Sequence, residues 1–286
     1  MVFARLFMPG GQAYVGGMSS LKVTFDTNTL KGAVTPDLCT SEPDHAAYVA
    51  VQEALKSGQI TGYFSEAVFA LDALGRQDKV DVVGGARIES QTYTTGPSAI
   101  TISIGSRWPR TPVNQQFLDR IQAALALGMR ALIGPRRMAD SLSVQGFGEN
   151  FYEPFASAEE IIARGGKANE VDAALARRGL GRARAVCLGL EYSKRDDATG
   201  EWWPQGIGRA RNKAERKKVH EAINEWADGD AIAAHIGYGN DLFCTNDLGR
   251  SAGQQSALHP INRAWLQDTY GVEFVTISEL GQRVAP

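Results

Sequence analysis

Two short apolar strands near opposite ends of the chain each end in a Thr/Asn/Asp group, and this shared ending constrains the fold most. The first strand lies in LKVTFDTNTL, residues 21–30, where the β-rich run Val23–Phe25 is followed by Asp26. The second lies in LFCTND, residues 242–247, and ends at Asp247. Open parallel sheets bind ligands outside the carboxyl ends of their strands. We therefore predict an α/β protein in which Asp26 and Asp247 lie at one edge of a central sheet.

Other carboxylates are expected at the same edge. The segment DGDAIAAH, residues 228–235, predicts a helix of small residues whose start carries Asp228 and Asp230. Crowded carboxylates repel one another unless a cation holds them, and oxygen-only ligation suits Mg²⁺ or Mn²⁺. For Asp26 taken alone the alternative is a helix cap, which is the commoner role of an Asp that follows a strand.

A further strand and helix are predicted over residues 59–64 and 66–74. Ser65 has the chemistry of an N-cap, and Glu66 stands in the first turn, where a carboxylate favours the helix dipole. That structural role accounts for Glu66 on its own. Asp72 is the fallback acid of this helix, and its ordinary role would be on a solvated face.

These residues together carry a family resemblance. In chain order FDTNTL, YFSEAVFAL, the D-x-IAAH helix and the TND strand end resemble a PIN domain, over roughly residues 21–85 and 214–284. The resemblance implies a three-layer α/β/α fold with a mostly parallel sheet, and a metal-dependent nuclease acting mostly on RNA. Its Mg²⁺ or Mn²⁺ ligands would be Asp26, Glu66, Asp228, Asp230 and Asp247. Behind these ligands, Asn28 and Thr245 would orient Asp26 and Asp247.

One position departs from the family pattern. An ungapped alignment of IAAH and TND puts the usual helix-start Asp on Gly229, with Asp228 before it and Asp230 after it. Either acid, or both, could take the role. If the helix begins at Gly229, Asp228 is its N-cap and Asp230 faces the cleft or the solvent.

The chain divides into a leader, 1–20, a nuclease core, 21–85 with 214–286, and a middle part, 86–213, that is an insertion or an extension of the core. A hairpin is predicted around Gly96-Pro97, a helix from Thr111, and a strand over 130–138 that could join the parallel sheet. Further on we predict helices on either side of Gly165-Gly166, a buried strand over 185–192 and a loop over 196–208.

The charge of the chain is divided in a way that suits a phosphate-backbone substrate. Residues 107–218 hold 20 Lys/Arg against 13 Asp/Glu, and the remainder holds 10 against 19, so the parts carry +7 and −9. The helix predicted over 212–227 presents Lys213, Arg216 and Lys217 as substrate-binding residues. An ordinary solvated face explains these three equally well. The pair Trp202-Trp203 belongs to a core or interface, or else stacks on unpaired bases.

Several other classes of protein are disfavoured. The first 20 residues have too short an apolar stretch for a signal peptide or a membrane span, and three unspaced cysteines suit a reducing cytoplasm. Two alternatives to the nuclease stay open, an inactive PIN-like module that binds RNA or protein and a haloacid-dehalogenase-like phosphatase. The phosphatase needs a second carboxylate two residues after Asp26, where the chain has Asn28. A homodimer and an inhibitory protein partner are also open.

Overall fold

The fold was examined in a computed structural model of the 286-residue chain, which describes residues 20–74, 76–96, 99–109, 115–135, 147, 150–196, 202–249 and 253–285. The predicted leader lies almost wholly outside these residues, as do residues 136–138 and the tip of the predicted hairpin. The strand predicted over 130–138 begins at Arg130 as expected but ends at Leu132, so it is shorter than predicted. Among the described residues, none of the helices has the length and apolar character that crossing a membrane would require.

The centre of the molecule is a five-stranded, all-parallel sheet in the order β5-β2-β1-β6-β7. Its strands are β1 (Leu21–Phe25), β2 (Ile60–Ser65), β5 (Arg130–Leu132), β6 (Leu242–Cys244) and β7 (Glu273–Val275). Helices flank the sheet, so the predicted three-layer α/β/α class is confirmed. The strand from the middle part of the chain, β5, forms one edge of this sheet by pairing with β2.

The first strand, β1, lies at the centre of the sheet, where it pairs with β2 on one side and with β6 on the other. In the parallel register Phe25 stands opposite Phe64 of β2 and opposite Cys244 of β6. The chain leaves β1 toward β2 on one side, and β6 fills the other side. Such a reversal of strand order opens a crevice at the carboxyl ends of the two diverging strands. Asp26 and Thr245 are the first residues beyond those ends.

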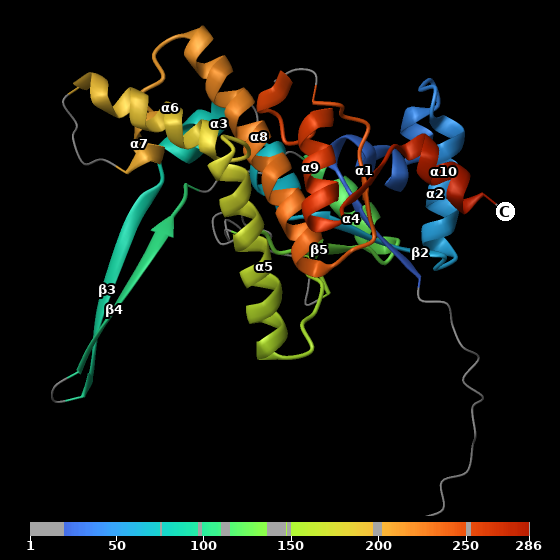
Figure 1. The fold of residues 1–286 in the computed structure, drawn as a ribbon, viewed down its shortest axis with the longest axis horizontal. Coiled ribbons are helices and arrows are strands. Elements are labelled where there is room, and N and C mark those ends of the chain that lie inside the picture. The colour runs from blue at the N-terminus through green and yellow to red at the C-terminus, as the bar shows by residue number, and fades with distance from the viewer. Residues whose placement is uncertain are drawn as a thin grey trace, which may run out of the picture.

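Two groups of helices cover the sheet (Figure 1). The first group is α1 (Thr27–Val34), α2 (His45–Lys56), α4 (Gln115–Ala126) and α10 (Ile277–Val284). The second gathers around α8 (Lys213–Tyr238) and contains α3 (Arg76–Gly84), α5 (Ala158–Arg177), α6 (Ala183–Ser193) and α7 (Trp203–Ile207). The helix α9 (Pro260–Tyr270) packs with α5, α8 and β6 through a shared apolar cluster. Short turns complete the chain: η1 (Pro36–Cys39), η2 (Val68–Asp72), η4 (Lys194–Asp196) and η5 (Gly253–Gln255).

The predicted hairpin is confirmed as an antiparallel pair, β3 (Arg87–Gly96) and β4 (Ala99–Arg107), which projects away from the body of the protein (Figure 1). Four tryptophans hold its base and α7 against α8. Ring centroids lie 5.9 Å apart for Trp108 and Trp202, 6.4 Å for Trp202 and Trp203, 5.6 Å for Trp203 and Trp226, and 6.1 Å for Trp226 and Trp108. The four rings therefore close a cycle, and Trp202 and Trp203 take their core role.

Three local predictions were wrong. The Gly165-Gly166 pair does not break α5, which is continuous. Residues 185–192 form a helix, α6, rather than a strand. An added Cβ on Gly189 would lie 2.1 Å from the Trp203 carbonyl oxygen, so this glycine permits close packing of α6 against the start of α7. The loop predicted over 196–208 contains η4 and the helix α7.

The most consequential correction concerns α8, which is one helix of 26 residues rather than two. Its N-cap is Asn212, so Asp228 and Asp230 lie in its middle and neither begins a helix. Gly229 does not mark a boundary. A Cβ there would lie 2.9 Å from the Cα of Gly181, so the glycine permits close packing of the helix against the turn before α6.

Candidate metal centre

Asp26 caps α1 and also faces the crevice at the end of β1. Its Oδ1 accepts from the backbone N–H of Thr27 at 2.7 Å, and its Oδ2 accepts from Asn28 Nδ2 at 2.5 Å and Thr245 Oγ1 at 2.7 Å. A carboxylate offers about four lone-pair positions, so three bonds leave room for a cation on Oδ1. The helix-cap role and a ligand role are therefore compatible in one side chain.

Asn28 and Thr245 both donate hydrogen bonds to the Asp26 carboxylate, and they also connect β1 to the turn after β6. Asn28 donates to Thr245 Oγ1 at 3.1 Å and accepts from the backbone N–H of Asn246 at 3.0 Å. Thr245 Oγ1 in turn accepts from the backbone N–H of Asp247 at 3.1 Å. Asp247 Oδ1 accepts from the Gly249 N–H at 2.7 Å, which fixes that side chain in the turn. These contacts keep Asp26 and Asp247 on one edge of the sheet.

Asp228 of α8 has a pKa that is raised by burial and by the charges of acids at the same edge. Burial is the largest cause of this upward shift, followed by the negative charges of Asp26, Asp72, Glu225 and Asp247. Because each of these charges acts on Asp228, the acids of β1, η2, α8 and the β6 turn form one group. We call Asp26, Asp72, Glu225, Asp228 and Asp247 the acidic cluster.

Burial also raises the pKa of other members of the acidic cluster, which disfavours their ionised forms. Burial raises the pKa of Asp26 to about 6; the Thr245 hydrogen bond opposes this, and the charge of Asp72 adds to it. Burial raises the pKa of Glu225 to about 7, against hydrogen bonds from Ser256 and the Ala257 backbone. Burial likewise raises the pKa of Asp72. Burial without a counter-charge disfavours the ionised form of a carboxylate, so a cation would be favourable beside these acids.

Asp72 and Glu225 are the two acids that sequence reasoning did not place in the site. Asp72 was expected on a solvated face of an α-helix, but residues 68–72 form a π-turn with a hydrogen bond from Ala73 N–H to the Val68 carbonyl, 3.1 Å. The extra residue in the turn rotates the downstream residues by about 100°. Asp72 then accepts from Thr27 Oγ1 at 2.6 Å. Glu225 stands one turn before Asp228 on α8, and that spacing was the available signal.

Glu66 and Asp230 both lie beside Gly134, which follows the end of β5. Glu66 Oε1 accepts from the Gly134 N–H at 3.0 Å, and Glu66 Oε2 accepts from the Tyr152 hydroxyl at 3.3 Å. A Cβ on Gly134 would lie 3.5 Å from Glu66 Oε1 and 3.8 Å from Asp230 Oδ2. Both acids are buried, Glu66 at 2% and Asp230 at 4% exposure, so Asp230 faces protein rather than open solvent.

The acidic cluster has the donor chemistry of a Mg²⁺ or Mn²⁺ site. All of its ligand atoms are carboxylate oxygens, and Glu225 Oε2 is a buried oxygen without a hydrogen-bond partner among the described residues. Within that same part of the chain, no three His, Cys, Asp or Glu side chains already enclose a point that could hold a metal ion. A cation would therefore have to draw these side chains inward. Asp26, Asp228 and Asp247 fit such a group best, with Glu225 behind them.

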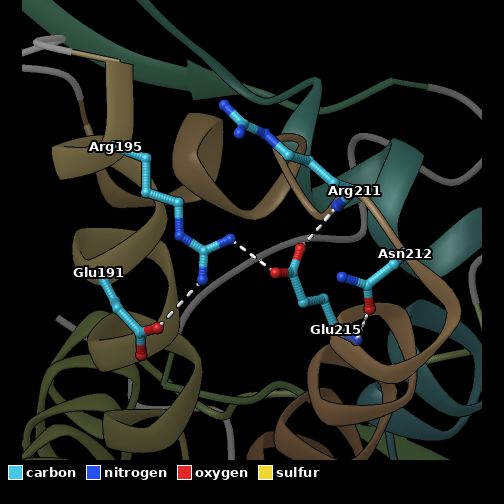
Figure 2. A network of polar contacts seen from close by, with 5 residues as sticks. All are labelled: Glu191, Arg195, Arg211, Asn212 and Glu215. Atoms are coloured by element: carbon cyan, nitrogen blue, oxygen red, sulfur yellow. Dashed lines mark hydrogen bonds and ion pairs between the residues drawn. The ribbon is translucent and has the colours of Figure 1, made fainter.

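A network of charged contacts fixes the start of α8 (Figure 2). The Glu215 carboxylate accepts from Arg195 Nη1 at 2.7 Å and from the Arg211 backbone N–H at 2.7 Å, while Asn212 Oδ1 accepts from the Glu215 N–H at 3.0 Å. Arg195 also donates to Glu191 at 3.1 Å. The Arg211 backbone hydrogen bond, with that from Arg195, lowers the pKa of Glu215. The network thus orients the first turn of α8.

The basic residues predicted to bind substrate lie on that first turn. Lys213 and Lys217 are exposed, Arg216 is half-buried, and Lys217 Nζ lies 3.8 Å from Glu221. Lys213 and Asp228 are fifteen positions apart on one continuous helix, which corresponds to about 22 Å at about 1.5 Å per residue. These cations are thus remote from the acidic cluster, and only a substrate that extends along α8 could contact both.

His235 is a packed helix histidine. It is 2% exposed, its ring lies 5.5 Å from that of Phe243, and its Nδ1 lies 2.9 Å from Thr24 Oγ1. Thr24 Oγ1 accepts from Asn240 Nδ2 at 2.8 Å, so its own hydrogen is available for a neutral imidazole. Burial lowers the pKa of His235 to about 3.

The buried imidazole predicts acid sensitivity. A lowered folded-state pKa means that the unfolded chain takes up the proton first, so stability falls as pH drops below about 6.5 and continues to fall toward 3. Between pH 7 and pH 5 this group alone should remove about 2 kcal/mol from the free energy of unfolding. Urea unfolding of wild type and His235→Gln at both pH values measures the difference. Equal losses in the two proteins would contradict the prediction.

Comparisons with known proteins add no assignment. A scan against protein families, a search of the curated proteins and a search of the solved structures each gave no match. The interpretation of the acidic cluster therefore depends on its geometry and its chemistry.

Proposed function

We propose that this chain is a Mg²⁺- or Mn²⁺-dependent nuclease of the PIN type, which hydrolyses phosphodiester bonds, chiefly in RNA. The observation that carries the proposal is the convergence of the acidic cluster at the switch point of a parallel sheet. Asp26 and Asp247 come from the ends of two adjacent strands, and Asp228 comes from the helix above them. Crevices of this kind bind ligands in open α/β sheets.

The side chains of the cluster would hold a cation and a water rather than carry protons as tuned acids. A divalent ion bound there would activate a water and stabilise charge on the phosphate and on the leaving oxygen. Asp26, held by three hydrogen bonds from Thr27, Asn28 and Thr245, supplies an oxygen in a fixed direction. Outer partners of this kind commonly contribute 10- to 100-fold to metal affinity.

RNA is favoured as substrate by the distribution of charge. The basic middle part and the first turn of α8 supply cations, and their distance from the acidic cluster suits an extended polyanion rather than a small phosphate ester. The phosphatase alternative is less favoured. It needs a second carboxylate at position 28, whereas the Asn28 side-chain amide forms hydrogen bonds with Asp26, Thr245 and the Asn246 backbone. A cytoplasmic location suits both the free cysteines and the substrate.

The test is a calorimetric titration with Mn²⁺ at pH 7.5, together with cleavage of mixed pools of RNA and single-stranded DNA. Wild type should bind the ion and cleave RNA. The double variant Asp26→Asn/Asp247→Asn should lose at least about 100-fold in Mn²⁺ affinity, beyond the range for outer partners, and should lose cleavage with it. Asp268→Asn makes the same chemical change on an exposed part of α9 and should leave both unchanged.

Two outcomes would point elsewhere. Wild-type protein that binds no Mn²⁺ would mean that the acidic cluster does not close on a cation, and the non-catalytic binding module would replace the nuclease. Cleavage that survives in the double variant would place the reaction outside the cluster, and the pair of Glu66 and Asp230 would be the next acids to replace.

A further inference from the structure

Lys79 places a buried positive charge against the acidic cluster, and the proposed function gives this charge no role. Lys79 of α3 is 1% exposed and is among the largest fully buried side chains of the described residues. Lysine is almost never fully buried unless it is paired. Its presence beside the carboxylates therefore calls for a role.

The partners of Lys79 place its ammonium on the α3 and α8 side of the acidic cluster. Its Nζ lies 4.0 Å from Asp72 Oδ1 and donates to Asn224 Oδ1 on α8, one residue before Glu225. Burial lowers the pKa of the Lys79 ammonium, whereas the charges of Asp72 and then Asp228 raise it. Both acids thus act on this ammonium, and they act to keep it protonated.

Both carboxylate oxygens of Asp72 already have partners in the protein. Its Oδ2 accepts from Thr27 Oγ1 at 2.6 Å, and its Oδ1 faces Lys79. On the other side of the cluster Arg263 donates to the backbone carbonyl oxygen of Asp247; burial lowers the pKa of its guanidinium, and the charges of Asp247 and Asp26 raise it. Among the described residues Asp72 has an ion pair within 4.0 Å, with Lys79, whereas Asp26, Asp228 and Asp247 have none, so these three acids are the part of the cluster that fits a metal.

From this division we infer that the Lys79 ammonium stands in for a second metal ion, so that the acidic cluster binds one divalent cation and not two. Sites with two metals hold the ions about 3.5–4 Å apart, and a fixed ammonium against Asp72 would repel a second divalent ion from that half. This inference rests on the proposed metal site. Lys79 is a positioning residue here, since it acts through Asp72 and Asp228.

The experiment measures how many Mn²⁺ ions bind to each chain rather than the rate of cleavage. Calorimetry with Mn²⁺, supported by electron paramagnetic resonance, should give one ion per wild-type chain without the coupling that two adjacent Mn²⁺ ions produce. Lys79→Gln removes the charge and should raise the count to two. The conservative variant Lys79→Arg should keep it at one. Lys79→Gln/Asp72→Asn removes the cation with its partner and should return the count to one.

The outcomes separate the two proposals. Two coupled Mn²⁺ ions in wild type would overturn the inference and leave the nuclease standing, and this measurement needs no variant to fold. A count of one in a folded Lys79→Gln protein, with affinity changed less than about 3-fold, would also overturn it and reduce Lys79 to a structural ion pair. No Mn²⁺ bound to wild type would overturn the metal site itself.

Discussion

Asp228→Asn is expected to reduce RNA cleavage by about 10³-fold or more and, at the same time, to raise the melting temperature of the metal-free protein. The loss corresponds to about 4 kcal/mol of transition-state stabilisation, which is the scale of charge stabilisation that a bound metal provides. The gain in stability has a separate cause. Burial and four neighbouring acids raise the pKa of Asp228, so its ionised form opposes folding, and the neutral amide removes that cost.

The sign of the stability effect can be checked with pH. An aspartate with a raised folded-state pKa is most costly above that pKa, and the cost disappears as the pH falls and the folded protein takes up the proton. Thermal unfolding in a chelator should therefore show a large gain for Asp228→Asn at pH 8 and a smaller gain at pH 5. Asp268→Asn should change neither cleavage nor melting. A melting temperature for Asp228→Asn below that of wild type would contradict the argument.

Trp226→Ala is expected to cost about 3–5 kcal/mol of folding free energy, the range for a fully buried tryptophan. Trp226 is 1% exposed, and its ring lies 6.1 Å from that of Trp108 and 5.6 Å from that of Trp203. Its removal opens a cavity where α8 meets α7 and the base of the hairpin. The total free energy of unfolding of a folded protein is about 5–15 kcal/mol. Urea unfolding followed by circular dichroism should therefore show a much lower midpoint concentration of urea for Trp226→Ala than for wild type.

Trp265→Ala is the matched control for that cavity. Trp265 of α9 is half-buried, with the Arg178 guanidinium 4.2 Å from its ring centroid and the Tyr270 ring 5.8 Å away. Cation–π contacts at such partly exposed positions contribute about 0.5–1 kcal/mol. The loss should therefore stay near 1 kcal/mol. Equal losses for Trp226→Ala and Trp265→Ala would show that the ring of tryptophans does not anchor the middle part of the chain.

The sequence predicts the strands β1, β2 and β6 well, because each is a short apolar run with polar residues after it. Asp26 at the end of β1 and the TND turn after β6 follow from that local pattern. Helix boundaries were harder, since tertiary packing overrode local preference. Gly229 looked like a helix start, but it serves the contact with Gly181, and Gly189 looked like part of a strand, but it serves the contact with Trp203.

The acids of the site also differ in how well the sequence predicts their positions. The positions of Asp26 and Asp247 depend on strand ends, which the sequence marks. The side of α8 on which Asp228 and Asp230 lie depends on the phase of a long helix, and the predicted break concealed that phase. Asp72 depends on a π-turn, and no simple residue pattern specifies the extra residue in such a turn. Glu66 was placed by resemblance, and its contacts with Gly134 and Tyr152 involve segments that resemblance did not cover.

The order of strands in the sheet has a consequence for how the protein is made. The central strand β1 is synthesised early, yet its neighbour β6 and the Thr245 hydroxyl that bonds Asp26 come 219 positions later. Pairings between such distant segments form slowly, and domains emerge from the ribosome at about 5–20 residues per second. One side of β1 therefore waits unpaired for tens of seconds of translation. During that interval Asp26 has neither Asp228 nor Asp247 beside it, so a growing chain cannot assemble the acidic cluster before residues 228–247 have been made.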